Sequence, residues 1–153
     1  MVKKGWMAVF LLFLPLTAAS LTINEVMYDP GQCSDSICEW IELYNSGETE
    51  VNLTGCLLEG KALSGIISAG GFAVAVRKEQ NFTQFFGNVD NLQELSFNLG
   101  NNGDTVQLAG RGDCNQTFNY TYLISFADGN NKTLERNFEQ EWGESKVAGG
   151  TPG

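Results

Sequence analysis

Apolar residues recur at every second position along short stretches of this chain, and turns rich in Gly, Asn and Asp separate the stretches. The stretch at residues 39–45 is typical. Ile41 and Leu43 fall on one side of an extended strand, and Trp40 and Glu42 fall on the other. Short runs of this kind, bounded by turn residues, predict β-strands that bury at least one face.

About eight or nine stretches follow this pattern, and no stretch of useful length has helical periodicity. The first stretch departs from strict alternation, which indicates a β-bulge, and residues 81–86 are long enough for one helical turn only. The sequence therefore predicts an all-β protein built as an antiparallel β-sandwich. The expected strands are residues 21–28, 39–45, 51–58, 63–67, 72–77, 95–99, 104–109, 118–126 and 133–137.

The first twenty residues have the composition of a secretory signal peptide. Lys3 and Lys4 precede an apolar run at residues 6–16, and small residues follow at 17–20. The apolar run is shorter than the roughly 20 residues of a membrane span. We therefore expect a signal peptide at residues 1–20, one domain at residues 21–153, a secreted or cell-surface location and no membrane span after cleavage. An uncleaved anchor is the alternative.

Four cysteines after a signal peptide predict two disulfide bonds. Four cysteines allow three connectivities, of which we favour Cys33–Cys38 together with Cys56–Cys114. A zinc site built from all four cysteines is the alternative, but their spacing does not form the paired knuckles of such sites.

The charge and the lack of histidine exclude several functions. Without Lys3 and Lys4, the chain has 7 basic and 18 acidic residues, a net charge of −11. Such an acidic surface disfavours the binding of nucleic acids and anionic membranes. The chain has no His, which removes the commonest general base and metal ligand. No cofactor is predicted.

Asn-x-Thr glycosylation sequons occur five times, where composition alone predicts roughly two. This excess predicts a glycoprotein, although a β-protein rich in Asn and Thr also collects sequons by chance. The acceptor residues would be Asn52, Asn81, Asn115, Asn119 and Asn131.

Three glutamates near the N-terminus raise the question of catalysis. Glu25, Glu39 and Glu42 could supply the two neighbouring carboxyl groups of an acidic hydrolase. Alternation places Glu39 and Glu42 on opposite sides of one strand, which makes them poor catalytic partners. We instead expect Glu42 to form a structural ion pair with an arginine such as Arg136.

Two further binding chemistries are open from the sequence. Asp104 and Asp128 lie in Asn- and Gly-rich turns, where they could contribute to a calcium site or simply stabilise the turns. Trp40 and Trp142 could stack on sugar rings, as in a carbohydrate-binding module, whereas packing in the core is the ordinary role of such residues.

Several motifs, taken together and in order, resemble the lamin tail domain family. The resemblance covers nearly all of residues 21–153. The motifs are INEVMYDP at residues 23–30, EWIELYN at 39–45, VNLTG at 51–55, NNGDTVQL at 101–108, TLER at 133–136, the tryptophan at 142 and the closing GTPG at 150–153.

The resemblance implies an immunoglobulin-like β-sandwich of the secreted prokaryotic type, without catalytic residues. The four cysteines depart from the usual family pattern, and so does the amino-acid sequence of the segment before Asp128. We therefore expect a non-catalytic binding or structural module that acts outside the cell on an unknown protein or glycan. A carbohydrate-binding module and an acidic extracellular hydrolase are the alternatives.

Overall fold

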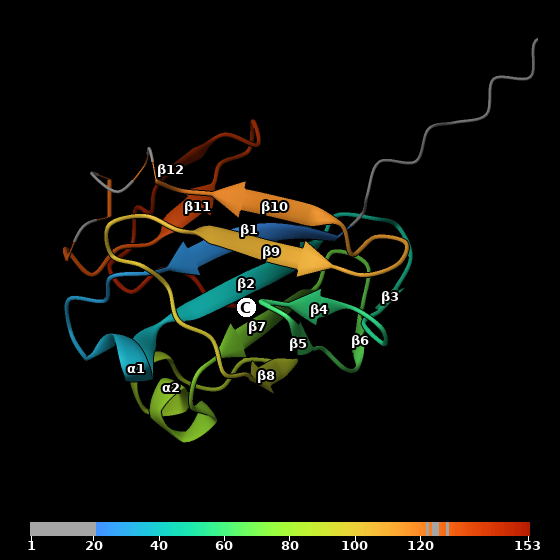
Figure 1. Ribbon diagram of the computed structural model, residues 1–153, viewed down its shortest axis with the longest axis horizontal. Coiled ribbons are helices and arrows are strands. Elements are labelled where there is room, and N and C mark those ends of the chain that lie inside the picture. Colours follow the sequence, from blue (N-terminus) through green and yellow to red (C-terminus); the bar gives the residue numbers. More distant parts are fainter. Residues whose placement is uncertain (1–20, 122, 124–125, 128) are drawn as a thin grey trace, which may run out of the picture.

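The fold is an all-β sandwich, as predicted. The computed structural model describes residues 21–121, 123, 126–127 and 129–153, which form twelve short strands and two short helices (Figure 1). The signal peptide predicted at residues 1–20 lies outside the described part of the chain.

The larger layer is a six-stranded sheet with the order β12-β11-β1-β2-β7-β8. Its strands pair in antiparallel fashion except for β7 and β8, which are parallel and so depart from the predicted antiparallel pattern. The long strands β1 and β2 lie in the middle of this sheet. The strand bounds are β1 (Leu21–Met27), β2 (Trp40–Asn45), β7 (Phe72–Val76), β8 (Leu92–Glu94), β11 (Leu134–Arg136) and β12 (Trp142–Glu144).

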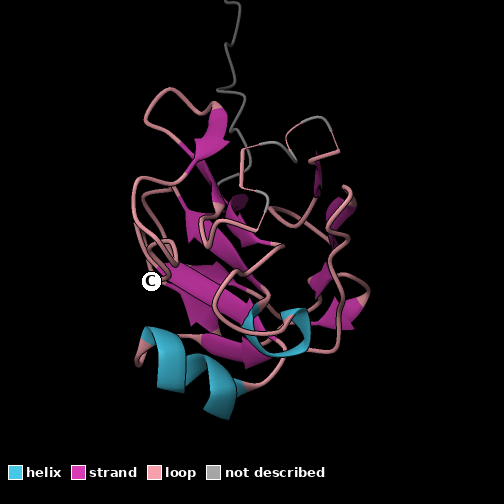
Figure 2. Ribbon diagram, turned by 90° about the vertical axis from the view of Figure 1, so that its left-hand side faces the viewer, coloured by secondary structure: helices cyan, strands magenta, loops and turns pink. Residues whose placement is uncertain are grey.

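The second layer is made of smaller sheets. One has four strands in the order β10-β9-β4-β5, and the other pairs β3 with β6. Short helices lie near one end of the sandwich (Figure 2). The remaining bounds are α1 (Asp35–Cys38), β3 (Val51–Asn52), β4 (Leu57–Leu58), β5 (Lys61–Ala62), β6 (Ile66–Ile67), α2 (Glu79–Phe86), β9 (Thr105–Ala109) and β10 (Gln116–Asn119).

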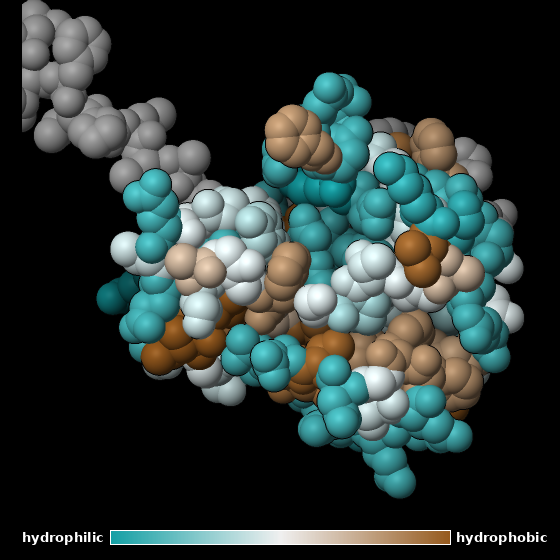
Figure 3. Space-filling view, turned by 180° about the vertical axis from the view of Figure 1, so that it is seen from behind, coloured by the Kyte–Doolittle hydropathy of each residue, from teal (hydrophilic) through white to brown (hydrophobic). Residues whose placement is uncertain are grey.

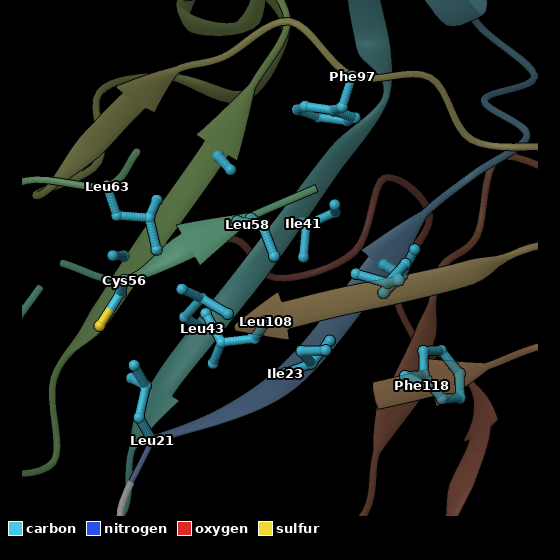
Figure 4. Packing of buried hydrophobic residues seen from close by; sticks show 14 of the residues in the cluster. Leu21, Ile23, Ile41, Leu43, Cys56, Leu58, Leu63, Phe97, Leu108 and Phe118 are labelled. Atoms are coloured by element: carbon cyan, nitrogen blue, oxygen red, sulfur yellow. The ribbon is translucent and has the colours of Figure 1, made fainter. Parts of the chain in front are cut away.

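The main hydrophobic core lies between the two layers. Ile41 and Leu43 of β2 face Leu58 and Leu108 of the opposite layer, and all four side chains are at most 1% exposed (Figure 4). Cys56 lies in the same cluster, bonded to Cys114. The alternation of residues 39–45 therefore identified the core-facing side of this strand correctly.

Two expected strands and the expected helical turn have different boundaries in the structure. Residues 51–58 divide into β3 and β4, which belong to different sheets, because a turn with Gly55 at a φ of 88° separates them. Residues 95–99 follow the short strand β8 and form no strand themselves. The eight-residue helix α2 is longer than the single turn expected at residues 81–86.

Strand β10 ends at Asn119, whereas the sequence predicted a strand at residues 118–126, of which 122, 124 and 125 lie outside the described part of the chain. The Asn119 side chain accepts a hydrogen bond from the Thr121 backbone N–H, and Leu123 N–H donates to the Tyr120 carbonyl. These are turn hydrogen bonds, so the chain leaves the sheet despite its alternating apolar residues. Tyr120 is fully buried nevertheless, because the turn packs it against Tyr28.

Candidate functional site

The outer face of the six-stranded sheet, opposite the main core, carries the most unusual chemistry of the described residues. A bulge in β1 places Glu25 there. Ile23 pairs with Leu43 and Glu25 pairs with Glu42, so Asn24 is an extra residue in β1. This extra residue shifts the alternation by one, and Glu25 therefore points away from the main core.

Glu25 and Glu42 are cross-strand neighbours on this face, and each side chain is only 1% exposed. Buried carboxyl groups require hydrogen-bond donors or a cation. Neither residue takes part in the salt bridges formed between described residues, which are Arg77–Glu39, Lys78–Glu94 and Lys132–Glu144.

The donors come largely from the end of the chain, residues 149–153, which we call the C-terminal tail. Thr151 donates to Glu25 from its backbone N–H at 3.1 Å and from its hydroxyl at 3.1 Å. The Gly153 N–H donates to Glu42 at 2.7 Å. The tail thus lies across β1 and β2 and binds both carboxyl groups.

Two further side chains complete the ring of donors. The Thr133 hydroxyl donates to Glu25, and the Asn24 amide donates to Glu42 at 2.7 Å. Asn24 is the extra residue of the bulge, so the same irregularity that turns Glu25 outward also supplies a donor to Glu42.

Burial controls the protonation of these carboxyl groups. Loss of hydration and, to a smaller extent, the neighbouring Glu42 raise the pKa of Glu25, hydrogen bonds from Thr133 and Thr151 oppose the rise, and the net pKa is about 7. Burial also raises the pKa of Glu42, with a smaller contribution from Glu135. Glu25 is therefore neutral in mildly acidic solution, where a free glutamate would be charged.

The tail reaches this face because Gly150 has no side chain. A Cβ atom at Gly150 would clash with a Glu25 carboxyl oxygen and lie 2.8 Å from the Trp40 ring, and the φ of 75° at Gly150 disfavours other residues. Trp40 itself is fully buried in a second, smaller apolar cluster on the outer face. That cluster contains Met27, Trp40, Val74, Val76 and Phe82.

Two clefts flank the tail, and the tail forms part of the wall of each. A cleft of about 430 Å³ lies beside Pro152 and Gly153, bounded by Phe72 and the loop at residues 88–91. A second of about 230 Å³ lies beside Gly149 and Gly150, bounded by α2. Figure 3 shows the protein from behind, where the surface is uneven and mixes hydrophilic and hydrophobic areas.

Glu25 and Glu42 meet one condition of the hydrolase alternative, since they are adjacent and have raised pKa values. An active site also requires both carboxyl groups to line an open cleft. Neither residue lines the two clefts beside the tail, and the tail covers both carboxyl groups. A substrate cannot reach them while the tail is bound.

Glu39 lies apart from this pair. It is fully buried, forms a salt bridge of 3.2 Å with Arg77, and has a pKa raised to about 7 by burial. The backbone of Leu99 and the Arg77 charge oppose this rise in the pKa. The three glutamates singled out in the sequence therefore do not form one cluster.

The ion pair expected between Glu42 and Arg136 is not among the salt bridges of the described residues. Arg136 donates from Nε to the Ile23 carbonyl at 3.0 Å, and its guanidinium lies 5.0 Å from the centre of the Trp142 ring. Glu42 does anchor distant parts of the chain, but its partner is the tail and not an arginine. The physical reason is that the tail supplies a neutral donor at the place where a cation was expected.

The two tryptophans considered for sugar stacking are buried to different extents. Trp40 is fully buried. Trp142 is half-buried and stacks on Phe118 with 3.6 Å between ring centres, which leaves its other face to Arg136. The binding role considered for Trp40 therefore has no exposed ring to support it, and the role considered for Trp142 stays a prediction.

The cysteines pair as expected, which excludes the four-cysteine zinc site. The Cα atoms of Cys33 and Cys38 are 6.0 Å apart, and those of Cys56 and Cys114 are 5.6 Å apart. No group of three or more His, Cys, Asp or Glu suited to a metal ion occurs among the described residues. The calcium alternative rested on Asp104, which caps a turn through Gly100 and Thr105, and on Asp128, outside the described residues.

The sequons lie at the surface to different degrees, and their occupancy stays a prediction. Asn52, Asn115 and Asn119 are exposed, whereas Asn81 and Asn131 are half-buried. Asn52 and Asn119 each accept a hydrogen bond from the backbone N–H two residues later, in the threonine of their own sequon.

Sequence reasoning missed the roles of Thr133, Thr151 and Asn45. Thr133 and Thr151 hold Glu25, and the Asn45 amide donates to the carbonyls of Thr49, Ile67 and Ser68. The GTPG ending was a signal for the tail, but a short polar segment does not indicate which distant side chains it contacts.

The fold and these contacts define a disulfide-closed β-sandwich whose buried carboxyl groups hold its own C-terminal tail. The chain belongs to the lamin tail domain family, whose model matches residues 15–122. Members of this family are non-catalytic immunoglobulin-like domains. Neither a curated protein nor a solved structure is significantly similar to the chain. Within the described residues, no helix has the length and apolar character needed to cross a bilayer.

Proposed function

We propose that the protein is a secreted or cell-surface, non-catalytic lamin tail module that binds a protein or glycan outside the cell. The observation that carries this proposal is the pair of disulfides, one closing the loop before β2 and one within the main core. Structural disulfides persist in oxidising compartments and are rare in the cytosol. The signal-like segment at residues 1–20 and the five sequons support the same location.

The non-catalytic part of the proposal rests on the use of the buried acids. Glu25 and Glu42 bind the tail, and Glu39 binds Arg77. Each of these carboxyl groups therefore has a structural partner, and none of the three residues lines the clefts flanking the tail. We propose the tail and the two clefts beside it as the binding surface.

Expression of the full chain in a secreting host tests the location. We expect protein in the medium whose N-terminus begins at Ser20 or Leu21, and non-reducing peptide mapping that recovers Cys33–Cys38 and Cys56–Cys114. Four free thiols in the secreted protein, or a retained chain with an intact N-terminus, would contradict the proposal. Incubation of the purified protein with cell-envelope material, read out for both proteins and glycans, then tests the binding role.

A further inference from the structure

We propose that N-linked glycans coat the second, smaller layer of the sandwich and leave the outer face of the six-stranded sheet uncovered. The acceptors in this proposal are Asn52, Asn115 and Asn119, whereas the sequons at Asn81 and Asn131 stay unmodified in the folded domain. The proposal rests on the extracellular location proposed above. It adds which sequons carry sugar and which face of the protein stays open to a partner.

The three proposed acceptors belong to one side of the molecule. Asn52 is the last residue of β3, Asn119 is the last residue of β10, and Asn115 directly precedes β10. Both strands belong to the second layer, which packs against the inner face of the six-stranded sheet. The tail lies on the opposite, outer face, and none of the three asparagines lines the clefts beside it. Glycans at these positions therefore leave the tail and its clefts open.

The folded chain presents both reactive residues of these three sequons. Leu53 and Tyr120, the middle residues of two of them, are fully buried. The asparagines and threonines of all three are exposed; they are residues 52, 54, 115, 117, 119 and 121. A transferase that recognises Asn-x-Thr therefore finds the amide and the hydroxyl together at the surface, without unfolding of the domain.

The local hydrogen bonds of Asn52 and Asn119 are compatible with modification. Their side-chain oxygens accept the N–H of Thr54 at 2.8 Å and of Thr121 at 3.0 Å. Glycosylation uses the other amide atom, Nδ2. This nitrogen bonds to the anomeric carbon of a glycosyl diphosphate, the bond from that carbon to the diphosphate oxygen breaks, and the diphosphate leaves with the electron pair. A base of the transferase takes one Nδ2 proton. The turn and the glycan therefore use different atoms.

The sequon at Asn131 is built into the outer face instead. Its threonine, Thr133, is fully buried, and the Thr133 hydroxyl donates to Glu25. Asn131 is half-buried, and its backbone carbonyl accepts the Gly149 N–H at the start of the tail. Modification of Asn131 therefore requires local opening of the contacts that hold the tail.

The sequon at Asn81 lies within α2. Asn81 is half-buried, and the next residue, Phe82, is fully buried with its ring edge-on to Trp40. The Thr83 hydroxyl donates to the Glu79 carbonyl of the preceding turn at 3.0 Å. A transferase therefore reaches this sequon only after α2 unwinds and Phe82 leaves its apolar cluster.

The first test measures glycosylation of the folded protein. The full chain is produced without glycans, its disulfides are closed, and it is incubated with an N-oligosaccharyltransferase and a polyprenyl-diphosphate oligosaccharide. Mass spectrometry gives the rate at each sequon, divided by the rate for an isolated peptide of the same sequence. We expect this normalised rate at Asn52, Asn115 and Asn119 to exceed that at Asn81 and Asn131 at least about tenfold, because the last two require local opening.

Two results would overturn the choice of acceptors. One is equal normalised rates at all five sequons of the folded protein. The other is no modification of Asn52, Asn115 and Asn119 in the folded protein while their peptides are modified. Protein retained inside the producing cell is oxidised after purification and enters the same assay. Failure here is therefore distinct from failure of the proposed location.

The second test asks whether the glycans cover one side only. Arg111 is exposed in the loop that leads to Asn115, and Lys146 is exposed before the tail. Glycosylation should slow tryptic cleavage after Arg111 at least about threefold, because exposed loops are where proteases cut, and should leave cleavage after Lys146 unchanged. Asn115→Gln, treated in the same way, should restore rapid cleavage after Arg111. An unchanged rate at Arg111, or equal slowing at Lys146, would overturn the one-sided coat.

Discussion

The two faces of the six-stranded sheet are both buried, but by different means. The inner face is apolar, packs against the second layer and contains the Cys56–Cys114 disulfide. The outer face carries the buried carboxyl groups of Glu25 and Glu42, which the C-terminal tail covers. Stability on the inner face should therefore depend on volume and covalent closure, whereas stability on the outer face should depend on hydrogen bonds and pH.

The largest loss of stability should come from removing the disulfide bond on the inner face. Replacing both Cys56 and Cys114 by alanine removes a disulfide with a sequence separation of 58. The chain-entropy model gives about 4 kcal/mol for a loop of this length. The matched double substitution of Cys33 and Cys38 opens a loop with a separation of 5 and should lose about 2 kcal/mol. Denaturant unfolding measures both losses in the free energy of unfolding, and equal losses would contradict the assignment of one long and one short disulfide loop.

Core volume should matter almost as much. Leu43→Ala removes a side chain that is 1% exposed in the main core, and should reduce the free energy of unfolding by about 3 kcal/mol. Leu57→Ala is the control, because Leu57 is 38% exposed and should lose less than about 1 kcal/mol. The loss from Leu43→Ala should be the same at pH 5 and pH 8. A strong pH dependence of that loss would break the contrast between the two faces.

The outer face should respond to pH instead. The pKa of Glu25 is raised from 4.5 to about 7, so the folded state holds a proton that the unfolded state releases. Its contribution to stability is present below pH 4.5 and is lost as the pH rises through about 7, by about 3 kcal/mol in total. Glu25→Gln removes this titration. The difference in unfolding free energy between wild type and Glu25→Gln should therefore shift in favour of the variant from pH 4.5 to pH 8, and a constant difference would refute the raised pKa.

A single hydrogen bond of the tail should have a smaller effect. Thr151→Val removes the hydroxyl that donates to Glu25 and should lose about 1 kcal/mol of stability. Thr151→Ser, which keeps the hydroxyl, should retain most of it. Hydrogen exchange at the Thr151 and Gly153 amides should quicken in the valine variant and not in the serine variant. Unchanged exchange in both would mean that the tail is held by other contacts.

The smallest effect is expected at the exposed salt bridge between Lys78 and Glu94. Both side chains are well exposed, at 62% and 44%, so solvent screens the interaction. Lys78→Ala should change the unfolding free energy by less than about 0.5 kcal/mol. A loss comparable with that of Thr151→Val would show that charge at the sheet edge matters as much as the buried site on the outer face.

Predictions from the local pattern were correct where the alternation of apolar and polar residues follows from the burial of one strand face. Ile41 and Leu43 alternate with outward-facing residues, and the structure places them in the main core. The same reasoning was wrong at Tyr120, Thr121 and Leu123, because alternation cannot reveal the turn hydrogen bonds that follow Asn119. It also misjudged the partner of Glu42, since a carboxylate indicates only that a donor or a cation is needed.

The sequence by itself determined the all-β class, the family, the paired cysteines and the core side of β2, because each depends on residue type or on spacing along the chain. Only the tertiary structure decided which groups the three glutamates contact. The bulge at Asn24 turns Glu25 outward, and Thr151, 126 residues away, then reaches it. Contacts over such separations arise from how the sheets assemble, and a local pattern holds no information about which distant segment will cover a buried charge.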